Sequence, residues 1–343
     1  MYGRTSLSPM TDAIEALLPL FQRQTAFVLT THTHPDGDGL GSEIALAEWL
    51  LSQGRRVRII NHSPTPEVYL FLDPLRRIER FDPKRHADTI RDAGVIVVLD
   101  TNHPDRLQTM QHSVVASRAT KICIDHHLDP APFAAHYLLD DDATSTGEIL
   151  YRLLLRAGGP TFSPVVAGPL YCAIMTDTGS FRYPRVDPEI HRIVAHLLEC
   201  GADPVGIYHQ VYEQWTAGRI QLLGAMLEGL QTAHDDRLVH VTITRDMLLR
   251  TGTREEDTDN FTVYPMSVRG TQAGILFLEL NDGLKISFRS RGDIAINELA
   301  KEFGGNGHKN AAGARLHDVS LEEARNRVVA AAAKYLGNPI PAD

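Results

Sequence analysis

Hydrophobic and polar positions in the first half of the chain alternate between short apolar runs and longer amphipathic segments. The apolar runs are rich in β-branched residues, and the segments between them have helical spacing. Continuous apolar strands separated by helices are typical of a parallel α/β sheet that is covered on both faces. We expect strands at residues 26–31, 57–61, 95–100 and 121–125, and helices at 42–51, 146–156 and 164–176.

The second half of the chain has a different pattern of apolar positions. Residues 187–232 are helical in pattern, and their later part, 201–232, is interpreted as a helical connector. A smaller α+β domain is expected to follow, with a hairpin at its centre because Asp282-Gly283 separates two apolar runs. We therefore predict domains at 1–200 and 233–343. The elements expected in the second are strands at 238–244, 274–281 and 284–290, and helices at 297–303 and 321–336.

Bulk properties narrow the range of partners. The 343 residues carry a net charge of -9, and no stripe rich in Lys and Arg marks a surface for long nucleic acid. No apolar run approaches the ~20 residues that cross a bilayer, and the first residues do not resemble a signal peptide. Three widely spaced cysteines without a CxxC pair predict free thiols. We expect a cytoplasmic protein that binds small phosphate compounds, with no membrane partner.

The densest chemistry follows the first predicted strand, in the segment His32-Thr33-His34-Pro35-Asp36-Gly37-Asp38. Taken alone, this segment is equally well explained as a solvated polar turn. Asp100, however, ends the third predicted strand, and Asp125-His126-His127 end the fourth. Ligands of open parallel sheets bind beyond the carboxyl ends of the strands. Oxygen and imidazole donors together predict a site there for Mn²⁺, Mg²⁺ or Zn²⁺.

Two further segments carry weaker signals. Asp177, in Thr176-Asp177-Thr178-Gly179, follows a helical run and by itself is an ordinary helix end. Residues 143–148 are interpreted as a helix cap, because Ser145 precedes Glu148 by three positions. The segment Gly304-Gly305-Asn306-Gly307-His308 is either a helix C-terminal loop or a phosphate cradle. Lys309, Arg289 and Arg291 nearby favour a cationic phosphate clamp.

Five of these pieces occur in the order of the motifs of a known family. HTHPDGD, the Asp that ends VIVVLD, DHH and DTGSF resemble motifs one to four of the DHH phosphoesterase superfamily. SFRSR followed by GGNGHKNAAG resembles the substrate-binding motif of the DHHA1 domain. The similarity runs from about residue 26 to about residue 313. The arrangement is similar to the branch of oligoribonucleases and pAp phosphatases that combines these two domains.

The resemblance implies two divalent cations, with Mn²⁺ expected first and Mg²⁺ as the alternative. It assigns six residues to them: His32 and Asp36 to one cation, Asp38, His126 and Asp177 to the other, and Asp100 as a bridge between both. His127 is implied to contact the phosphate or assist the leaving group, while Asp125 orients the histidines. Sequence alone does not choose between His32 and His34.

The second domain is implied to bind the substrate phosphate, with Arg289, Gly304, Gly305, Gly307 and His308 as its contacts. Asn306 departs from the family pattern, which has Gly there; because Asn tolerates left-handed backbone conformations, the loop is expected to survive the change. Gly39, where Ala is common, is a smaller departure.

The predicted activity is hydrolysis of very short RNAs, such as the dinucleotides pApA or pGpG, to mononucleotides, and of pAp to AMP. Two alternatives stay open: a phosphatase or phosphodiesterase of small or cyclic nucleotides without an RNase role, and a regulator that binds nucleotides without catalysis. The oligomeric state is left open, with a homodimer as one option.

Overall fold

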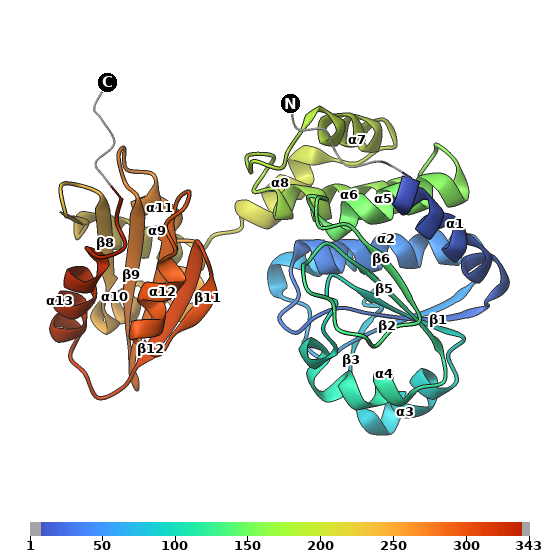
Figure 1. Ribbon diagram of the computed structural model, residues 1–343, viewed down its shortest axis with the longest axis horizontal. Coiled ribbons are helices and arrows are strands. Elements are labelled where there is room, and N and C mark those ends of the chain that lie inside the picture. The colour runs from blue at the N-terminus through green and yellow to red at the C-terminus, as the bar shows by residue number, and fades with distance from the viewer. Residues whose placement is uncertain (1–7, 338–343) are drawn as a thin grey trace. The chain divides into compact units, whose positions relative to one another are not determined.

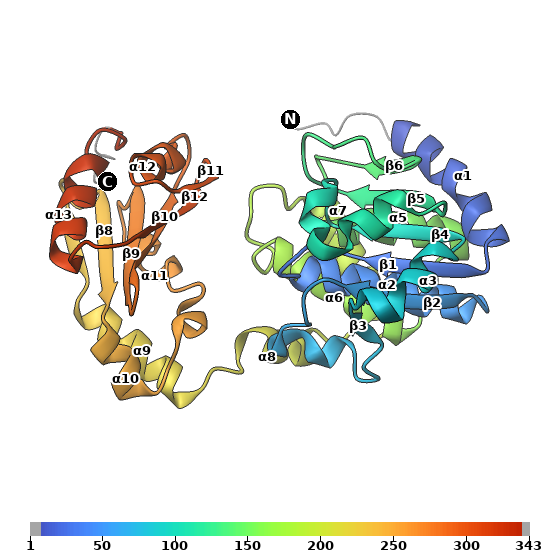
Figure 2. The same cartoon turned by 90° about the horizontal axis from the view of Figure 1, so that it is seen from below.

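The computed structural model describes residues 8–337, and the chain divides between Gln214 and Trp215 into two compact units. Each unit is built on a six-stranded sheet with helices packed against it (Figures 1 and 2). The cysteines are free, and Cys123 and Cys172 are buried. Within residues 8–337, no helix has both the length and the apolar character needed to cross a membrane.

The sheet of the first unit is parallel throughout, in the order β3-β2-β1-β4-β5-β6. The four strands that the apolar runs predict are present, each within one residue of its expected ends. Two short edge strands, β3 and β6, were not predicted. The bounds are β1 Ala26–Thr30, β2 Arg56–Asn61, β3 Ile78–Arg80, β4 Val95–Leu99, β5 Thr120–Asp125 and β6 His136–Leu139.

Alternate side chains of the central strands enter two separate cores. In β1, Phe27 and Leu29 pack into the larger core, whereas Val28 packs into the smaller core on the other face. Burial on both faces explains why these strands are continuously apolar. Figure 1 shows helices above and below the sheet. The larger core contains α2 Gly37–Ser52, α5 Thr146–Gly158, α6 Pro164–Asp177, α1 Ser8–Arg23 and α7 Pro188–Glu199; the smaller contains α3 Pro83–Arg91, α4 Gln111–Ala116 and η2 Pro104–Met110.

Helix α2 begins five residues before its predicted start at residue 42. Asp36 is its N-cap, and the Asp36 carboxylate accepts hydrogen bonds from the backbone N–H groups of Asp38 and Gly39. Of the segment that resembled a polar turn, residues 32–35 are a loop, and residues 36–38 form the N-cap and the start of a buried helix. This start places Asp36 and Asp38 at a fixed distance from the end of β1.

Of the predicted connector, α8 Pro204–Tyr212 belongs to the first unit and α9 Ala217–Glu228 to the second. The sheet of the second unit has the order β11-β12-β10-β9-β8-β7, and its strands are antiparallel except for the parallel pair β8 and β9. The predicted hairpin is present as β9 and β10. The strands are β7 Gln231–Ala233, β8 Leu238–Ile243, β9 Ala273–Leu280, β10 Gly283–Ser290, β11 Asn306–His308 and β12 Ala311–Leu316.

Helices cover both faces of this second sheet. On one face, α12 Ile296–Glu302 and α13 Leu321–Ala332 bury Phe277, Ile286 and Phe288. On the other, α9, α10 Arg245–Thr251 and α11 Val263–Met266 pack around Leu276 and Leu278. Successive residues of β9 thus supply opposite cores, as the two-residue period of a strand requires.

The glycine-rich segment is partly a strand and not only a loop. Residues 306–308 form β11, which pairs antiparallel with β12. Gly307 has a φ of 147°, and a Cβ atom there would lie 2.4 Å from the carbonyl oxygen of Ala311. Asn306 is not among the described residues with positive φ, so its tolerance of left-handed backbone is not what preserves this segment. Its place in the β11–β12 ladder, opposite Gly313, preserves it.

A buried carboxyl group connects α2 to the end of β1. Glu43 accepts a hydrogen bond from the Asn61 amide at 2.8 Å, and the Asn61 oxygen accepts one from the backbone N–H of Thr31 at 3.2 Å. Thr31 precedes His32, so this chain of bonds supports the loop that carries the predicted ligands. Burial raises the pKa of Glu43 from 4.5 to about 8, against the opposing effect of the Asn61 hydrogen bond.

This raised pKa predicts a stability that depends on pH. Below pH 4.5 the carboxyl group is protonated in both states; as pH rises, the unfolded chain ionises first. Wild-type stability should therefore fall between about pH 4.5 and 8, by a few kcal/mol from this group. Glu43→Gln should flatten that part of the profile, measured as the free energy of unfolding in urea at several pH values. Glu199→Gln, at an exposed position of α7, should keep the wild-type slope; an unchanged slope in Glu43→Gln would contradict the assignment.

Candidate metal centre

The predicted ligands gather at the carboxyl edge of the first sheet. His32 lies in the loop after β1, Asp100 directly follows β4, and His126 directly follows β5. Asp36 and Asp38 come from the start of α2, and Asp177 is the last residue of α6. Parallel strands end at one edge, which explains why segments almost 150 residues apart in sequence meet there.

His32, Asp36 and Asp100 form the first group that could hold a metal ion. The His32 Nε2 atom lies 3.2 Å from Asp100 Oδ2 and 3.9 Å from Asp36 Oδ1. His32 and Asp100 are buried, while the Asp36 side chain is 54% exposed. His34, the sequence alternative to His32, is exposed and is not part of any such group within residues 8–337. The structure therefore favours His32 over His34 as a candidate metal ligand, a choice that the sequence alone left open.

Asp38, His126 and Asp177 form the second group. The His126 Nε2 atom lies 3.4 Å from Asp177 Oδ2, 3.6 Å from Asp100 Oδ1 and 3.8 Å from Asp38 Oδ2. Three carboxylates therefore surround one imidazole nitrogen. This composition corresponds to the second cation site implied by the sequence resemblance.

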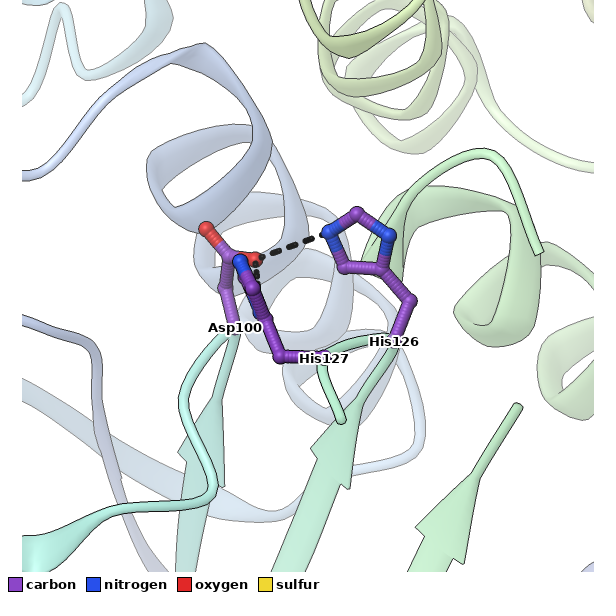
Figure 3. A group of neighbouring side chains, drawn as sticks. All are labelled: Asp100, His126 and His127. Carbon is purple, nitrogen blue, oxygen red and sulfur yellow. Dashed lines mark ion pairs between the residues drawn. The ribbon is translucent and has the colours of Figure 1, made fainter. Parts of the chain in front are cut away.

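A third group consists of Asp100, His126 and His127, shown in Figure 3. Both histidines come from the end of β5, and dashed lines in the figure join them to Asp100. The His127 Nδ1 atom is 2.7 Å from Asp125 Oδ1, but 3.9 Å from Asp100 Oδ1. Its nearer partner is Asp125, so its Nε2 atom is left for another contact. This arrangement favours a substrate role for His127 over a ligand role.

Asp100 belongs to two of the three groups and has an unusual backbone conformation. Its φ is 59°, in the left-handed region that non-glycine residues seldom adopt. Such strain persists only where surrounding contacts hold it, and it is concentrated at functional sites. Here Thr146 Oγ1 donates to Asp100 Oδ1 at 3.2 Å, and His32 contacts the other carboxylate oxygen.

The N-terminus of α5 binds the Asp38 carboxylate. The backbone N–H groups of Thr146 and Gly147 donate to Asp38 Oδ2 and Oδ1 at 2.7 and 2.9 Å. Free N–H groups at a helix start favour a negative charge. The sequence predicted a helix cap at this segment, and Ser145 does cap α5. Its second role, holding a predicted ligand more than 100 residues away, was not visible in the sequence.

Gly39 provides space beside the first group. A Cβ atom there would lie 2.5 Å from Thr31 Oγ1 and 3.3 Å from Asp100 Oδ2. The Thr31 hydroxyl donates to the carbonyl of Leu99, at the end of the strand that delivers Asp100. A side chain at residue 39 would clash with the Thr31 hydroxyl. The packing of Thr31 therefore explains why this chain has Gly at a position where Ala is common.

The buried carboxylates of the centre repel one another. Burial, and next the negative charges of neighbouring carboxylates, raise the pKa values of Asp38 and Asp100 well above the ordinary range. Burial followed by the charge of Asp36 raises the pKa of Asp177 to about 6. Burial lowers the pKa of His126 to about 4, which favours the neutral imidazole that metals bind.

These observations fit a divalent cation. The donors are imidazole nitrogens and carboxylate oxygens, without a thiolate, a mixture that suits Mn²⁺, Mg²⁺ or Zn²⁺. A cation would also offset the mutual repulsion of the carboxylates and favour their ionised form. The Asp125 Oδ2 atom is buried, and no hydrogen-bond partner for it exists within residues 8–337.

The predicted substrate-binding residues lie in the second unit. Arg289 of β10 and His308 of β11 both pair with Ala311 of β12, from its two sides. Residues paired in this way share one face of a sheet, so the two cationic or polar side chains flank a small alanine. The neighbouring clamp candidates are engaged elsewhere: Lys309 pairs with Asp293 at 2.7 Å, and Arg291 donates to the carbonyl of Met266.

Two arginines near the centre were missed in the sequence. Arg106 donates to His32 Nδ1 at 3.1 Å. The charge of Arg185 opposes the raised pKa of Asp177 and adds to the effect of burial that lowers the pKa of His126. Neither belongs to a quoted motif. Arg106 follows Asp100 by only six residues. A positively charged side chain so soon after the Asp that ends a strand is the one sequence feature that could have indicated its place near the centre.

Comparisons with known proteins agree with this geometry. The model of the DHH family, N-terminal domain, matches residues 26–174, and that of the DHHA1 domain matches residues 239–338. A crystal structure of an exopolyphosphatase-related protein from Bacteroides fragilis is 31% identical, with a TM-score of 0.89 over 95% of this chain and 96% of that one.

Two curated relatives have the same name, bifunctional oligoribonuclease and PAP phosphatase NrnA. The protein from Thermus thermophilus is 28% identical, covering 90% of this chain and 89% of its own length. The protein from Bacillus subtilis is 26% identical, covering 88% and 92%. Fold and site together define a metal-dependent phosphoesterase. The chain belongs to the DHH family and carries a DHHA1 domain.

The shared position of Asp100 predicts that its loss affects more than one cation. Asp100→Asn should weaken Mn²⁺ binding at the first group, to which Asp100 belongs, and at the second, whose His126 lies 3.6 Å from Asp100 Oδ1. It should reduce phosphoesterase activity about 100-fold or more. Asp177→Asn, which alters only the second group, should retain one tightly bound cation. Mn²⁺ stoichiometry is measured by the loss of the free-ion EPR signal. Wild-type stoichiometry and activity in Asp100→Asn would refute the shared-ligand assignment.

Proposed function

We propose that the protein hydrolyses very short oligoribonucleotides to mononucleotides and removes phosphate from pAp to produce AMP. The observation that carries this proposal is the cluster of three His and carboxylate groups at one sheet edge, each of which contains Asp100 or His126. The two curated relatives, named for these activities, align over about nine tenths of the chain and support the substrate class.

We further propose two divalent cations, with Mn²⁺ as the physiological pair. His32 and Asp36 would hold one, Asp38, His126 and Asp177 the other, and Asp100 both. When bound, the cations supply an activated water and neutralise charge on the phosphoryl oxygens. The competition between buried carboxylates for protons supports this choice of ligands, since metal binding replaces those protons.

The hydrogen bond between His127 and Asp125 supports the roles that we propose for these two residues. Asp125 is buried and accepts from His127 Nδ1, which fixes the orientation of the ring. The His127 side chain is 43% exposed, so the ring is partly accessible from solvent. We assign His127 to contact with the phosphate or the leaving oxygen, and Asp125 to orienting it.

In functional terms we assign residues 1–200 to catalysis, 201–232 to a connector and 233–343 to substrate binding. Arg289 and His308 would bind a substrate phosphate, together with the backbone of Gly304, Gly305 and Gly307. The common pairing of Arg289 and His308 with Ala311 supports a joint role. Gly305 and Gly307 approach β12 so closely that strand pairing alone also requires them.

Substrate length is the first test. Hydrolysis should fall steeply beyond roughly five nucleotides, because a chain of charge -9 offers few phosphate-neutralising contacts to a longer RNA. A product time course on 5′-labelled RNAs of 2 to about 24 nucleotides, with and without Mn²⁺, measures this dependence. Equal rates on the shortest and the longest RNA would exclude the proposal. Turnover of pAp alone would leave only the phosphatase activity.

Arg289→Ala tests the assignment of the second domain. It should leave Mn²⁺ binding intact and reduce kcat/KM on pAp or a dinucleotide tenfold to a hundredfold, since a charge-assisted phosphate contact contributes about 1.5–3 kcal/mol. The loss should be smaller on bis-p-nitrophenyl phosphate, which has no second phosphate.

The matched control is Lys285→Ala, on the same strand and face but paired with Glu255. It lies about 13 Å along β10 from Arg289 and should keep wild-type kinetics. Loss of metal in Arg289→Ala, or equal impairment on both substrates, would show that the assignment is wrong.

A further inference from the structure

Arg106 is held rigidly beside the first ligand group. It lies in η2, whose residues Leu107 and Met110 are buried in the smaller core. The backbone carbonyl of Arg106 accepts a hydrogen bond from the N–H of Thr33 at 2.8 Å, which ties η2 to the loop after β1. The Arg106 side chain reaches back to His32, with its NH2 group 3.1 Å from His32 Nδ1. Its position is therefore determined by both backbone and core contacts.

The contact between Arg106 and His32 is incompatible with a cation on His32. The Nδ1 atom of His32 lies 2.8 Å from the carbonyl oxygen of Thr33, which can only accept a hydrogen bond. It also faces the guanidinium of Arg106, which can only donate one. Only one of these two bonds forms at a time.

The choice between them depends on the other ring nitrogen. His32 Nε2 is the atom that faces Asp36 and Asp100. When Nε2 gives its lone pair to a cation, Nδ1 carries the proton and donates it to Thr33. The guanidinium of Arg106 then loses its acceptor on His32 and has donors to offer to another group.

Within residues 8–337, no carboxylate replaces His32 as the partner of Arg106. Among the described residues 8–337, none forms an ion pair with Arg106, whereas Arg152, Arg156 and Arg58 in the same unit all pair with a Glu. Arg106 is half-buried, so its charge is only partly hydrated. A guanidinium with this surrounding is well suited to a phosphate oxygen that arrives at the neighbouring metal site.

We propose that Arg106 is a substrate-binding residue of the first domain, released from His32 when a cation binds and then donating to the phosphate under attack. The inference rests on the proposed phosphoesterase function but adds a contact that no motif of the sequence indicated. It places the contact beside the cations, on the same domain that delivers them. The scissile phosphate, and not a distant one, is therefore the group that Arg106 recognises.

The test measures metal and phosphate separately, without turnover. Mn²⁺ binding to wild type, Arg106→Ala and Arg106→Lys is followed by EPR, and inorganic phosphate binding to each Mn²⁺-loaded protein by paramagnetic broadening of the ³¹P resonance. Arg106→Ala should bind Mn²⁺ at least as tightly as wild type, because a neighbouring positive charge is removed, and bind phosphate about tenfold or more weakly. Arg106→Lys should retain part of the phosphate affinity, since it keeps the charge but not the planar fork.

Arg91→Ala, at the exposed end of α3 where Arg91 pairs with Asp88, is the matched control and should bind both ions like wild type. Wild-type phosphate affinity in Arg106→Ala would overturn the proposal. Loss of Mn²⁺ binding in that variant would also overturn it, because Arg106 would then only position His32. A protein that fails to cleave dinucleotides but shows the predicted phosphate effect would refute the proposed substrate while supporting the role of Arg106.

Discussion

Mutual repulsion of buried carboxylates is the constraint on which the rest of the first unit depends. Asp38 and Asp100 are almost completely buried within reach of Asp36 and Asp177, so desolvation and like charge both oppose their ionisation. A folded chain retains such a cluster only if the cost is offset. The N-terminus of α5, the hydroxyl of Thr146 and neutral imidazoles offset part of it, and divalent cations are the natural complement for the remainder.

The architecture of the parallel sheet makes this arrangement possible. Strands that are apolar on both faces fix their own positions through two cores, and their carboxyl ends then deliver polar residues to one edge without disturbing either core. Helices α2 and α5 begin at that edge, so their first turns contribute backbone N–H groups where negative charge accumulates. The Glu43–Asn61–Thr31 chain adds a polar support below the loop that carries His32.

The second unit positions its candidate site in a different way. Its mixed sheet has helices on both faces, and its candidate site is a row across three strands at the β11 side of the sheet. Arg289 and His308 both pair with the short Ala311, and this arrangement supports the joint anion-binding role that we propose for them. The glycines of this region serve close strand approach first, which allows the backbone to lie near a ligand without being evidence for one.

The sequence by itself determined the central strands, the order of the motifs and the residue types of the metal centre. Double-sided burial produces continuous apolar runs, and the motifs lie where those runs end. Elements whose pattern is short or local were decided only by tertiary structure, among them the edge strands β3 and β6 and the pairing of β11. So were the choice of His32 over His34, the binding of Asp38 by α5 and the reach of Arg106 to His32. Each of these depends on contacts between segments distant in sequence, which only the packing of helices on a completed sheet brings together.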